Sequence, residues 1–297
     1  MREKLRRTLN SDAVFDVVVN VIGGIIVLIV LIPLIFVLAA SFSDPDLVIR
    51  GKVLLLPKGF TTKAYVMVFE NEDIWRGFIN SCFYTAAGTA ISVVLTILAA
   101  YPLSRKNFAG RGIFMMLILF TMYFSGGMIP TYLLVKNLGM YNTVWALLIP
   151  AALSTYNLIV ARTFFENSIP SELYEAGTLD GCNNLQMLLQ IVLPLSKAIL
   201  AVLVLYYAVD IWNAYFDALI YIRDADMHPL QIVLRNILLL GQTEQMGTND
   251  AGMAEKIKMA EAVKYSAIVV SSIPMLIIYP FVQKYFVRGV MIGAVKG

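Results

Sequence analysis

Charged residues are scarce in this chain. Asp, Glu, Lys and Arg make up 14% of its 297 residues, whereas hydrophobic residues make up 59%. Soluble domains usually carry about 25% charged residues. The balance therefore argues against a soluble domain and predicts an all-α integral membrane protein, because helices satisfy their own backbone groups in lipid.

Histidine and cysteine are nearly absent, which limits the chemistry that the chain can perform. The single histidine, His228, precedes Pro229 and is better explained as part of a helix start than as a catalytic base. Cys82 falls in an apolar run and Cys182 in a polar loop, so we expect neither a disulfide nor a redox role. The sequence contains no phosphate-binding G-x-x-x-x-G-K-[ST] loop, no H-E-x-x-H and no Cys/His set with metal-ligand spacing. We therefore expect no cofactor, no metal and no enzymatic activity in this chain.

Net charge is also low. A formal charge of +3, with no long basic run, argues against a nucleic-acid partner. The basic residues that exist gather near the ends of apolar runs, where they bear on membrane topology.

Six apolar runs are long enough to cross a bilayer, which takes about 20 residues. The first run exceeds the apolar core of a signal peptide, which has about 7–15 residues, so we expect an uncleaved span that follows a cytoplasmic N-terminus. The short loop that holds Arg105, Lys106 and Arg111 without an acid is also expected in the cytoplasm. The predicted spans are residues 17–40, 77–104, 112–135, 140–161, 197–222 and 265–283.

This topology places both termini in the cytoplasm and treats residues 1–297 as a single transmembrane domain. It also leaves two long polar segments on the outer side, residues 41–76 and 223–264. These segments are longer than a simple connection between two helices requires.

Residues 170–194 form a long polar interruption between the fourth and fifth predicted spans. Pro170 and Ser171 suit the start of a helix, and Asp180-Gly181 suits its end. A second short helix should follow and end at Pro194. Its apolar face has the spacing of an amphipathic helix: Leu185, Leu188, Leu189 and Val192. An ordinary amphipathic loop between spans would share these features.

Three parts of this loop carry a resemblance to a known family: Glu175-Ala176-Gly177, then Asp180-Gly181, then Ile191-Val192-Leu193-Pro194. In this order they resemble the EAA loop of importer-type ABC transporter permeases. Gly177 stands where that pattern usually has its second alanine. Both residues are small, so close helix approach survives, although Gly costs about 1 kcal/mol of helix propensity.

Further stretches are similar to the carbohydrate-uptake branch of that family, in particular to the second permease of maltose-type systems. These are Trp212-Asn213, Met227-His228-Pro229-Leu230 and residues 289–297. The stretch Phe124–Thr143 is similar to permeases that import complex oligosaccharides.

The resemblance implies several partners in a bacterial plasma membrane. It implies a second homologous permease, two ABC ATPase subunits that bind ATP and Mg²⁺, and an extracellular solute-binding protein, all assembled around membrane lipid. It also implies that the loop docks onto an ATPase through Glu175, Ala176, Gly177, Asp180 and Gly181. The outer segments would then receive the binding protein.

A polar face in the fifth predicted span is a candidate for the sugar path. Tyr206, Asp210, Asn213 and Asp217 recur at spacings that place them on one side of a continuous helix. A carboxylate inside a bilayer costs at least ~2.5 kcal/mol unless it meets water or a partner, so this face should avoid lipid. Trp212 adds a flat surface for a sugar ring, and Tyr123 is a further candidate. The alternative is that these side chains only join span five to its neighbours.

Two other functional classes remain open on the residues alone. A membrane-embedded enzyme acting on lipid-linked glycans would need carboxylates near the interface, such as Asp224 and Asp226. A proton-coupled secondary sugar carrier would use Asp210 and Asp217. The EAA-like loop argues against both classes.

Overall fold

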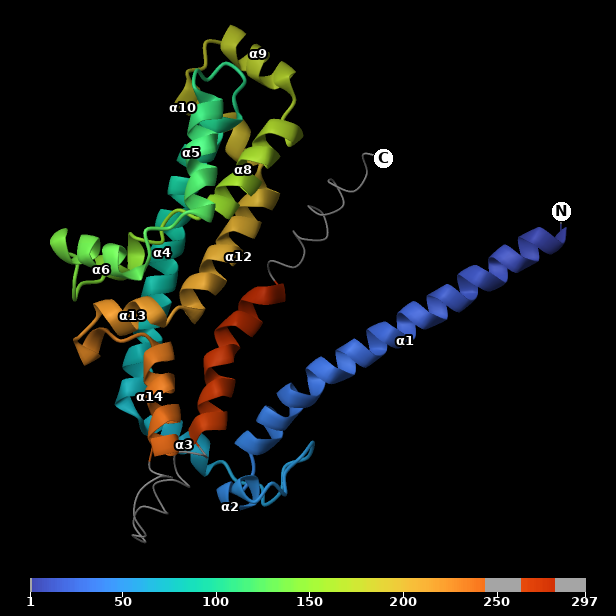
Figure 1. Ribbon diagram of the computed structural model, residues 1–297, viewed down its shortest axis with the longest axis vertical. Helices are drawn as coiled ribbons and strands as arrows, with labels where there is room; N and C mark the ends of the chain where they lie inside the picture. Colours follow the sequence, from blue (N-terminus) through green and yellow to red (C-terminus); the bar gives the residue numbers. More distant parts are fainter. Residues whose placement is uncertain (1, 244–262, 281–297) are drawn as a thin grey trace. The chain divides into compact units, whose positions relative to one another are not determined.

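The computed structural model describes residues 2–243 and 263–280, and this part of the chain is helical without a strand (Figure 1). It divides into two compact units. One comprises Met1–Asn71 with Leu234–Ser271, and the other Glu72–Val233 with Ser272–Gly297. The all-helical membrane fold predicted from composition is thus confirmed at this level.

The first unit is built on α1 (Arg2–Ser41), followed by the short helices α2 (Pro45–Ile49) and α3 (Lys63–Glu70). The apolar part of α1, Val14–Ser41, is long enough to cross a membrane, and its most apolar window is not buried inside the protein. The C-terminal end of α1 is packed instead. Ser41 Oγ lies 2.8 Å from Tyr65 Oη, and the Phe42 ring lies 4.8 Å from the Tyr65 ring. The start of the first predicted outer segment therefore folds back on the end of α1.

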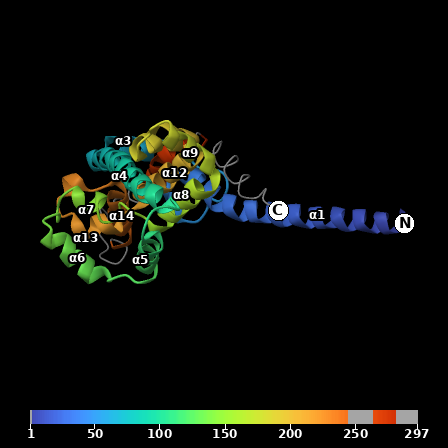
Figure 2. The same ribbon diagram turned by 90° about the horizontal axis from the view of Figure 1, so that it is seen from above.

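The second unit is organised around α4 (Glu72–Ser104), along which α8 (Thr155–Ser168) and α12 (Lys197–Asn213) pack side by side (Figures 1 and 2). Small side chains make this approach possible. A Cβ atom added at Gly88 of α4 would lie 2.8 Å from Ile211 Cδ1 of α12. Further along the same contact, Thr96 Oγ1 and Tyr207 Oη are 2.6 Å apart.

Two predicted spans are not continuous helices. Residues 112–135 coincide with α5 (Arg111–Tyr123) and α6 (Met128–Asn137), which meet at 114°. Gly127, at the break, has φ +85° and ψ 171°, a conformation essentially confined to glycine. Residues 140–161 contain α7 (Trp145–Leu148) and the first half of α8, separated at Pro150, which has no backbone N–H to continue a helix.

The fifth predicted span, residues 197–222, is also interrupted. α12 ends at Asn213, whose side-chain amide donates back to Val209 O, one turn earlier in the helix, at 2.8 Å. The chain continues with α13 (Phe216–Tyr221), the 3₁₀ turn η2 (Ala225–Met227) and α14 (Leu230–Thr243). The assumption of one continuous helix with one polar face was therefore wrong for Asp217, which lies on α13.

Three helices in the described residues are long and apolar enough to span a membrane: Val14–Ser41, Glu72–Ser104 and Val263–Pro280. The number rises to five if each of two bent pairs crosses as one span. One pair is α5 with α6, and the other is Asn184–Leu195 with α12, bent by 85°. The count of six spans and the placement of both termini in the cytoplasm stay predictions.

Candidate functional site

The predicted coupling loop contains two helical segments joined by a tight turn. The first is α9 (Ser171–Leu179), and the turn after it uses Gly181 at φ +81°, which favours glycine. The second begins with a capping box. Asn183 Oδ1 accepts from the Gln186 N–H and Gln186 Oε1 accepts from the Asn183 N–H, both at 2.9 Å.

The second segment differs from the expected α-helix that ends at Pro194. It runs through α10 (Asn184–Gln186), the π-helical turn η1 (Met187–Val192) and α11 (Leu193–Leu195). Pro194 is therefore inside the segment, where the wider hydrogen-bond spacing of the preceding π turn accommodates its missing donor. Of the predicted apolar face, Leu188 and Val192 are buried, whereas Leu185 and Leu189 are exposed.

Gly177 lies where the two segments of the loop press together. A Cβ atom at Gly177 would lie 2.5 Å from Met187 Cε and 3.2 Å from Ile191 Cδ1. Because Met187 fills this space, the glycine lets α9 approach η1 closely.

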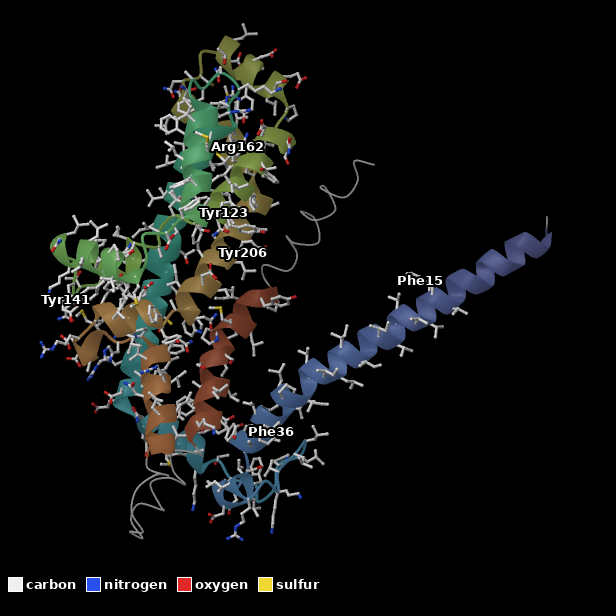
Figure 3. The ribbon with its side chains drawn as sticks, viewed as in Figure 1. Phe15, Phe36, Tyr123, Tyr141, Arg162 and Tyr206 are labelled. Carbon is white, nitrogen blue, oxygen red and sulfur yellow. The ribbon has the colours of Figure 1, made fainter. Side chains whose placement is uncertain are left out.

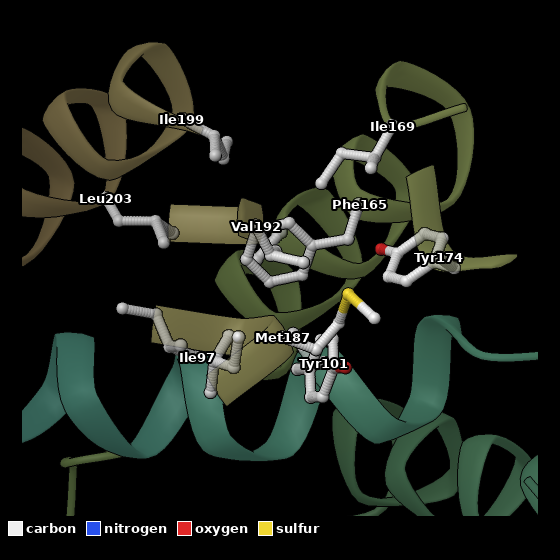
Figure 4. Close-up of a cluster of buried hydrophobic side chains, with 12 residues drawn as sticks. Ile97, Tyr101, Phe165, Ile169, Tyr174, Met187, Val192, Ile199 and Leu203 are labelled. Atoms are coloured by element: carbon white, nitrogen blue, oxygen red, sulfur yellow. The ribbon is translucent and has the colours of Figure 1, made fainter. Parts of the chain in front are cut away.

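A buried cluster fastens the loop to the rest of the second unit (Figure 4). It brings together side chains of α4, α8, the loop and α12, including Ile97, Phe165, Tyr174, Val192 and Leu203. Burial of such large apolar side chains contributes about 1.5–3 kcal/mol each. The loop is therefore held as part of a packed structure.

Four of the five predicted coupling residues are exposed, namely Glu175, Ala176, Asp180 and Gly181, and Gly177 is buried. The sequence analysis missed Leu179, the last residue of α9, whose side chain is 89% exposed. An exposed leucine beside exposed acids at a helix end offers a mixed surface for a protein partner. Its only sequence signal was an apolar residue next to Asp180-Gly181.

A cleft of about 830 Å³ opens beside α9 and is bordered by the loop after α4 and the end of α8. In its wall the Arg105 guanidinium lies 3.3 Å from the centre of the Tyr174 ring. Burial raises the pKa of Tyr174, and Arg105 opposes part of that rise. The ring therefore meets the cation as a neutral phenol.

A second cavity, of about 340 Å³, lies among α4, the α7–α8 connection, α12 and α13. Its polar lining consists of Ser81, Tyr84, Ser154, Tyr207, Asp210 and Asp217. Asp210 comes from α12 and Asp217 from α13, so the break after Asn213 brings the two carboxylates into one cavity. Such an arrangement can accept hydrogen bonds from hydroxyl groups.

The other predicted path residues lie outside this lining. Figure 3 labels Tyr206 on α12 and Tyr123 at the end of α5, where 78% of the Tyr123 side chain is exposed. Tyr206 lies beside Tyr156, with 6.3 Å between the ring centres. Trp212 is 3% exposed and packs edge-on against Phe78. Sequence reasoning missed four polar side chains of the lining, namely Ser81, Tyr84, Ser154 and Tyr207, the last being the immediate neighbour of Tyr206.

The carboxylates considered for an enzyme have structural partners. Asp226 Oδ1 accepts from Arg76 Nη1 at 2.6 Å, and Asp224 Oδ1 accepts from the Asp226 N–H at 3.1 Å. The carbonyl of His228 accepts from Asn80 Nδ2 at 3.1 Å. These contacts hold residues 224–228 against α4. In the residues that the structure describes, no three His, Cys, Asp or Glu side chains form a group that could hold a metal ion.

Comparison with known proteins gives a consistent result. The family described as "Binding-protein-dependent transport system inner membrane component" matches residues 92–292. The polygalacturonan/rhamnogalacturonan transport system permease protein YtcP of Bacillus subtilis is 42% identical over 292 residues, covering 97% of this chain and 100% of that protein. Protein LplC of the same organism is 40% identical over 287 residues, covering 97% and 96%.

A solved structure is similar as well. It is the crystal structure of a bacterial ABC transporter involved in the import of the acidic polysaccharide alginate. One of its chains is 35% identical to this chain with a TM-score of 0.83, and the match covers 93% of this chain and 98% of that one.

Proposed function

Because the chain belongs to the family of binding-protein-dependent transport system inner membrane components, we propose that it forms half of the translocation path of an ABC importer for oligosaccharides. Members of this family are transport subunits of the plasma membrane and cross it several times. The chain is accordingly a permease component and not an enzyme, and ATP hydrolysis takes place in a partner ATPase. The ATP and Mg²⁺ would be bound there, and this chain would need no cofactor of its own.

The cargo class rests on the relatives. One relative is named for transport of polygalacturonan and rhamnogalacturonan, and a structurally similar chain belongs to an importer of the acidic polysaccharide alginate. Polysaccharide fragments are therefore the class of cargo that we propose here. Neutral and acidic oligosaccharides should both be offered in a test.

The cavity that holds Asp210 and Asp217 is the observation that carries the sugar path. Its volume of about 340 Å³ falls within the range of small-molecule sites, which is about 300–1,000 Å³. Two carboxylates and several hydroxyl groups point to a ligand rich in hydroxyl donors. Asp217 is half-buried, whereas Asp210 is exposed on this chain, so a second subunit or water beside Asp210 would have to keep its carboxylate from lipid, where it would be costly.

The coupling loop would face the cytoplasm and dock onto the ATPase. Glu175, Asp180 and the exposed Leu179 would supply the contact surface, and Gly181 would supply the turn that exposes it. We propose two ATPase subunits and a second, homologous permease in the complete assembly. Closure of the ATPase pair would then move the helices as rigid bodies.

The outer segments would receive an extracellular solute-binding protein. In residues 41–71 the structure describes α2, α3 and the contacts that fold this segment on α1. Residues 223–243 hold η2 and α14, whereas residues 244–262 lie outside the described residues. The C-terminal stretch 289–297, which is similar to carbohydrate-uptake permeases, also lies outside them.

The path is tested by removing charge without removing volume. Asp210→Asn and Asp217→Asn, each in the assembled complex, should lower oligosaccharide uptake about tenfold while assembly and basal ATP hydrolysis persist. A loss of that size corresponds to about 1.4 kcal/mol, just below the range of about 1.5–3 kcal/mol for a hydrogen bond to a charged group. Asp16→Asn, at an exposed carboxylate of α1 outside the proposed docking surfaces, is the matched control and should leave uptake unchanged. Unaltered uptake in both Asp variants would remove this cavity from the path.

A further inference from the structure

The ends of α4, α5 and α8 nearest α9 are joined by one charged network. Glu166 of α8 accepts from Arg111 Nη1 at 3.1 Å with Oε1, and its Oε2 lies 2.7 Å from Arg162 Nη2. Arg162 Nε also donates to Leu103 O at 3.1 Å. Figure 3 labels Arg162 on α8.

The contact of Arg162 with Leu103 satisfies a group at a helix end. Leu103 belongs to the last turn of α4, whose carbonyls have no partner within the helix. A guanidinium is favourable there because it also meets the negative end of the helix dipole. Arg111 is the first residue of α5, so Glu166 connects the start of α5 with the end of α4 through Arg162.

A second contact joins the candidate coupling helix to the same place. Arg105 directly follows α4, and its guanidinium covers the ring of Tyr174 in α9 at 3.3 Å. Tyr174 is 7% exposed and belongs to the buried cluster, so its ring is fixed. A cation over the face of a buried aromatic ring is held by both charge and packing.

The helices joined in this way also line the sugar cavity. Ser81 and Tyr84 come from α4 and Ser154 caps the start of α8, so both helices reach from the network to the cavity. α8 leads through Ile169 and Pro170 directly into α9. A movement of α9 would therefore be passed on to α4 through the contact of Arg105, and to α8 through the continuous backbone.

We propose that Arg105 and Glu166 are positioning residues that transmit movement of α9 to α4, α5 and α8 as one rigid body. The apolar cluster alone would hold these helices together, but apolar contacts are non-directional and permit sliding. Charged hydrogen bonds fix the register between helix ends because they depend on direction as well as distance. The inference rests on the proposed function, since it requires that α9 is the helix on which the ATPase acts.

Conservative changes are the way to test these side chains. The side chains of Arg111, Glu166 and Arg162 are 29%, 24% and 20% exposed, so the ion pairs are largely shielded from solvent and their complete loss would cost stability. Glu166→Gln keeps the volume of the side chain and one acceptor oxygen for the arginines. A role in transmission should therefore appear in coupling and not in assembly. The informative quantity is the number of sugars taken up per ATP hydrolysed.

The test uses the complete transporter, with its second permease, ATPase and binding protein, in proteoliposomes. Glu166→Gln and Arg105→Ala should each lower uptake per ATP at least fivefold while assembly and basal hydrolysis stay within twofold of wild type. Arg105→Lys, which keeps the charge but loses the planar group, should lie between Arg105→Ala and wild type. Lys136→Ala, in the last turn of α6 and exposed, lies outside the proposed docking and coupling surfaces; it is the control and should behave as wild type.

A double-mutant comparison separates transmission from general damage. If Arg111 acts through Glu166, then Arg111→Gln with Glu166→Gln should lower uptake per ATP no further than Glu166→Gln alone. An unchanged ratio in both Glu166→Gln and Arg105→Ala would overturn the proposal. A loss of assembly, or an equal fall of uptake and hydrolysis in every variant including Arg105→Lys, would assign these contacts to structure only and would overturn it too.

Failure of the underlying function would look different. In that case the wild-type complex would take up no oligosaccharide, or Glu175→Ala with Gly181→Asp would leave ATPase association unchanged. Both measurements precede the network variants, so the two failures can be told apart.

Discussion

Single residues set how closely the helices of this permease approach one another. Gly177 was expected to be a tolerated replacement for alanine in the coupling loop. In the structure, the end of the Met187 side chain fills the space that a side chain at Gly177 would need, and Ile191 lies close by. The sequence showed that a small residue belongs there, but not which side chain fills the space, because that depends on how the loop folds back on itself.

The expected effect of a side chain at Gly177 depends on its shape. Gly177→Ala should change the free energy of unfolding by less than about 1 kcal/mol, because the helix-propensity gain offsets displacement of the flexible Met187 methyl. Gly177→Val adds a branched side chain that also meets Ile191, and overpacking of this kind costs about 1–3 kcal/mol. Thermal unfolding of the purified complex and co-purification of the ATPase measure both effects. Equal behaviour of the two variants would contradict this packing.

At the scale of secondary-structure elements, the structure departs from the predicted continuous spans at the points where helices break. Apolar composition predicted continuous spans over 112–135, 140–161 and 197–222, because a broken helix can be as hydrophobic as a straight one. The signals for the breaks were Gly126-Gly127, Pro150 and the C-terminal Asn213. Whether each of these signals breaks a helix could not be predicted from the sequence, since neighbouring helices decide whether a break is tolerated in a membrane protein. The break after Asn213 matters most, because it brings Asp217 to the cavity of Asp210.

The α5–α6 break offers a matched pair of glycines. Gly127→Ala should destabilise the protein by about 1–3 kcal/mol, because its backbone conformation is strained for any other residue. Gly126→Ala should be nearly neutral, since its φ is not in the left-handed region and the nearest atom, Pro130 Cβ, would be in ordinary contact at 3.9 Å. Thermal unfolding of the two variants checks the difference. A Gly126→Ala variant as unstable as Gly127→Ala would mean that α5 and α6 do not meet in this geometry.

At the scale of the whole molecule, the sequence predicted the class of protein better than its working parts. Scarce charge and the EAA-like loop led to a membrane-embedded importer subunit, which the comparisons confirm. The sugar path could be predicted only in part. Asp210 was visible as a carboxylate in an apolar span, whereas Tyr207 and the network around Glu166 depend on contacts between distant segments. Such contacts leave no local pattern in the sequence.

The central claim is that ATP, and not a proton gradient, drives oligosaccharides through this chain. It is tested most directly by uptake of a labelled oligosaccharide into proteoliposomes that hold the complete transporter and its loaded binding protein. We predict that chemically intact sugar accumulates in the vesicles only when the ATPase can hydrolyse ATP. A proton ionophore should leave this uptake unchanged. Uptake that continues without ATP hydrolysis and collapses with the ionophore, or cleavage or transfer of the glycan by the complex, would contradict the account.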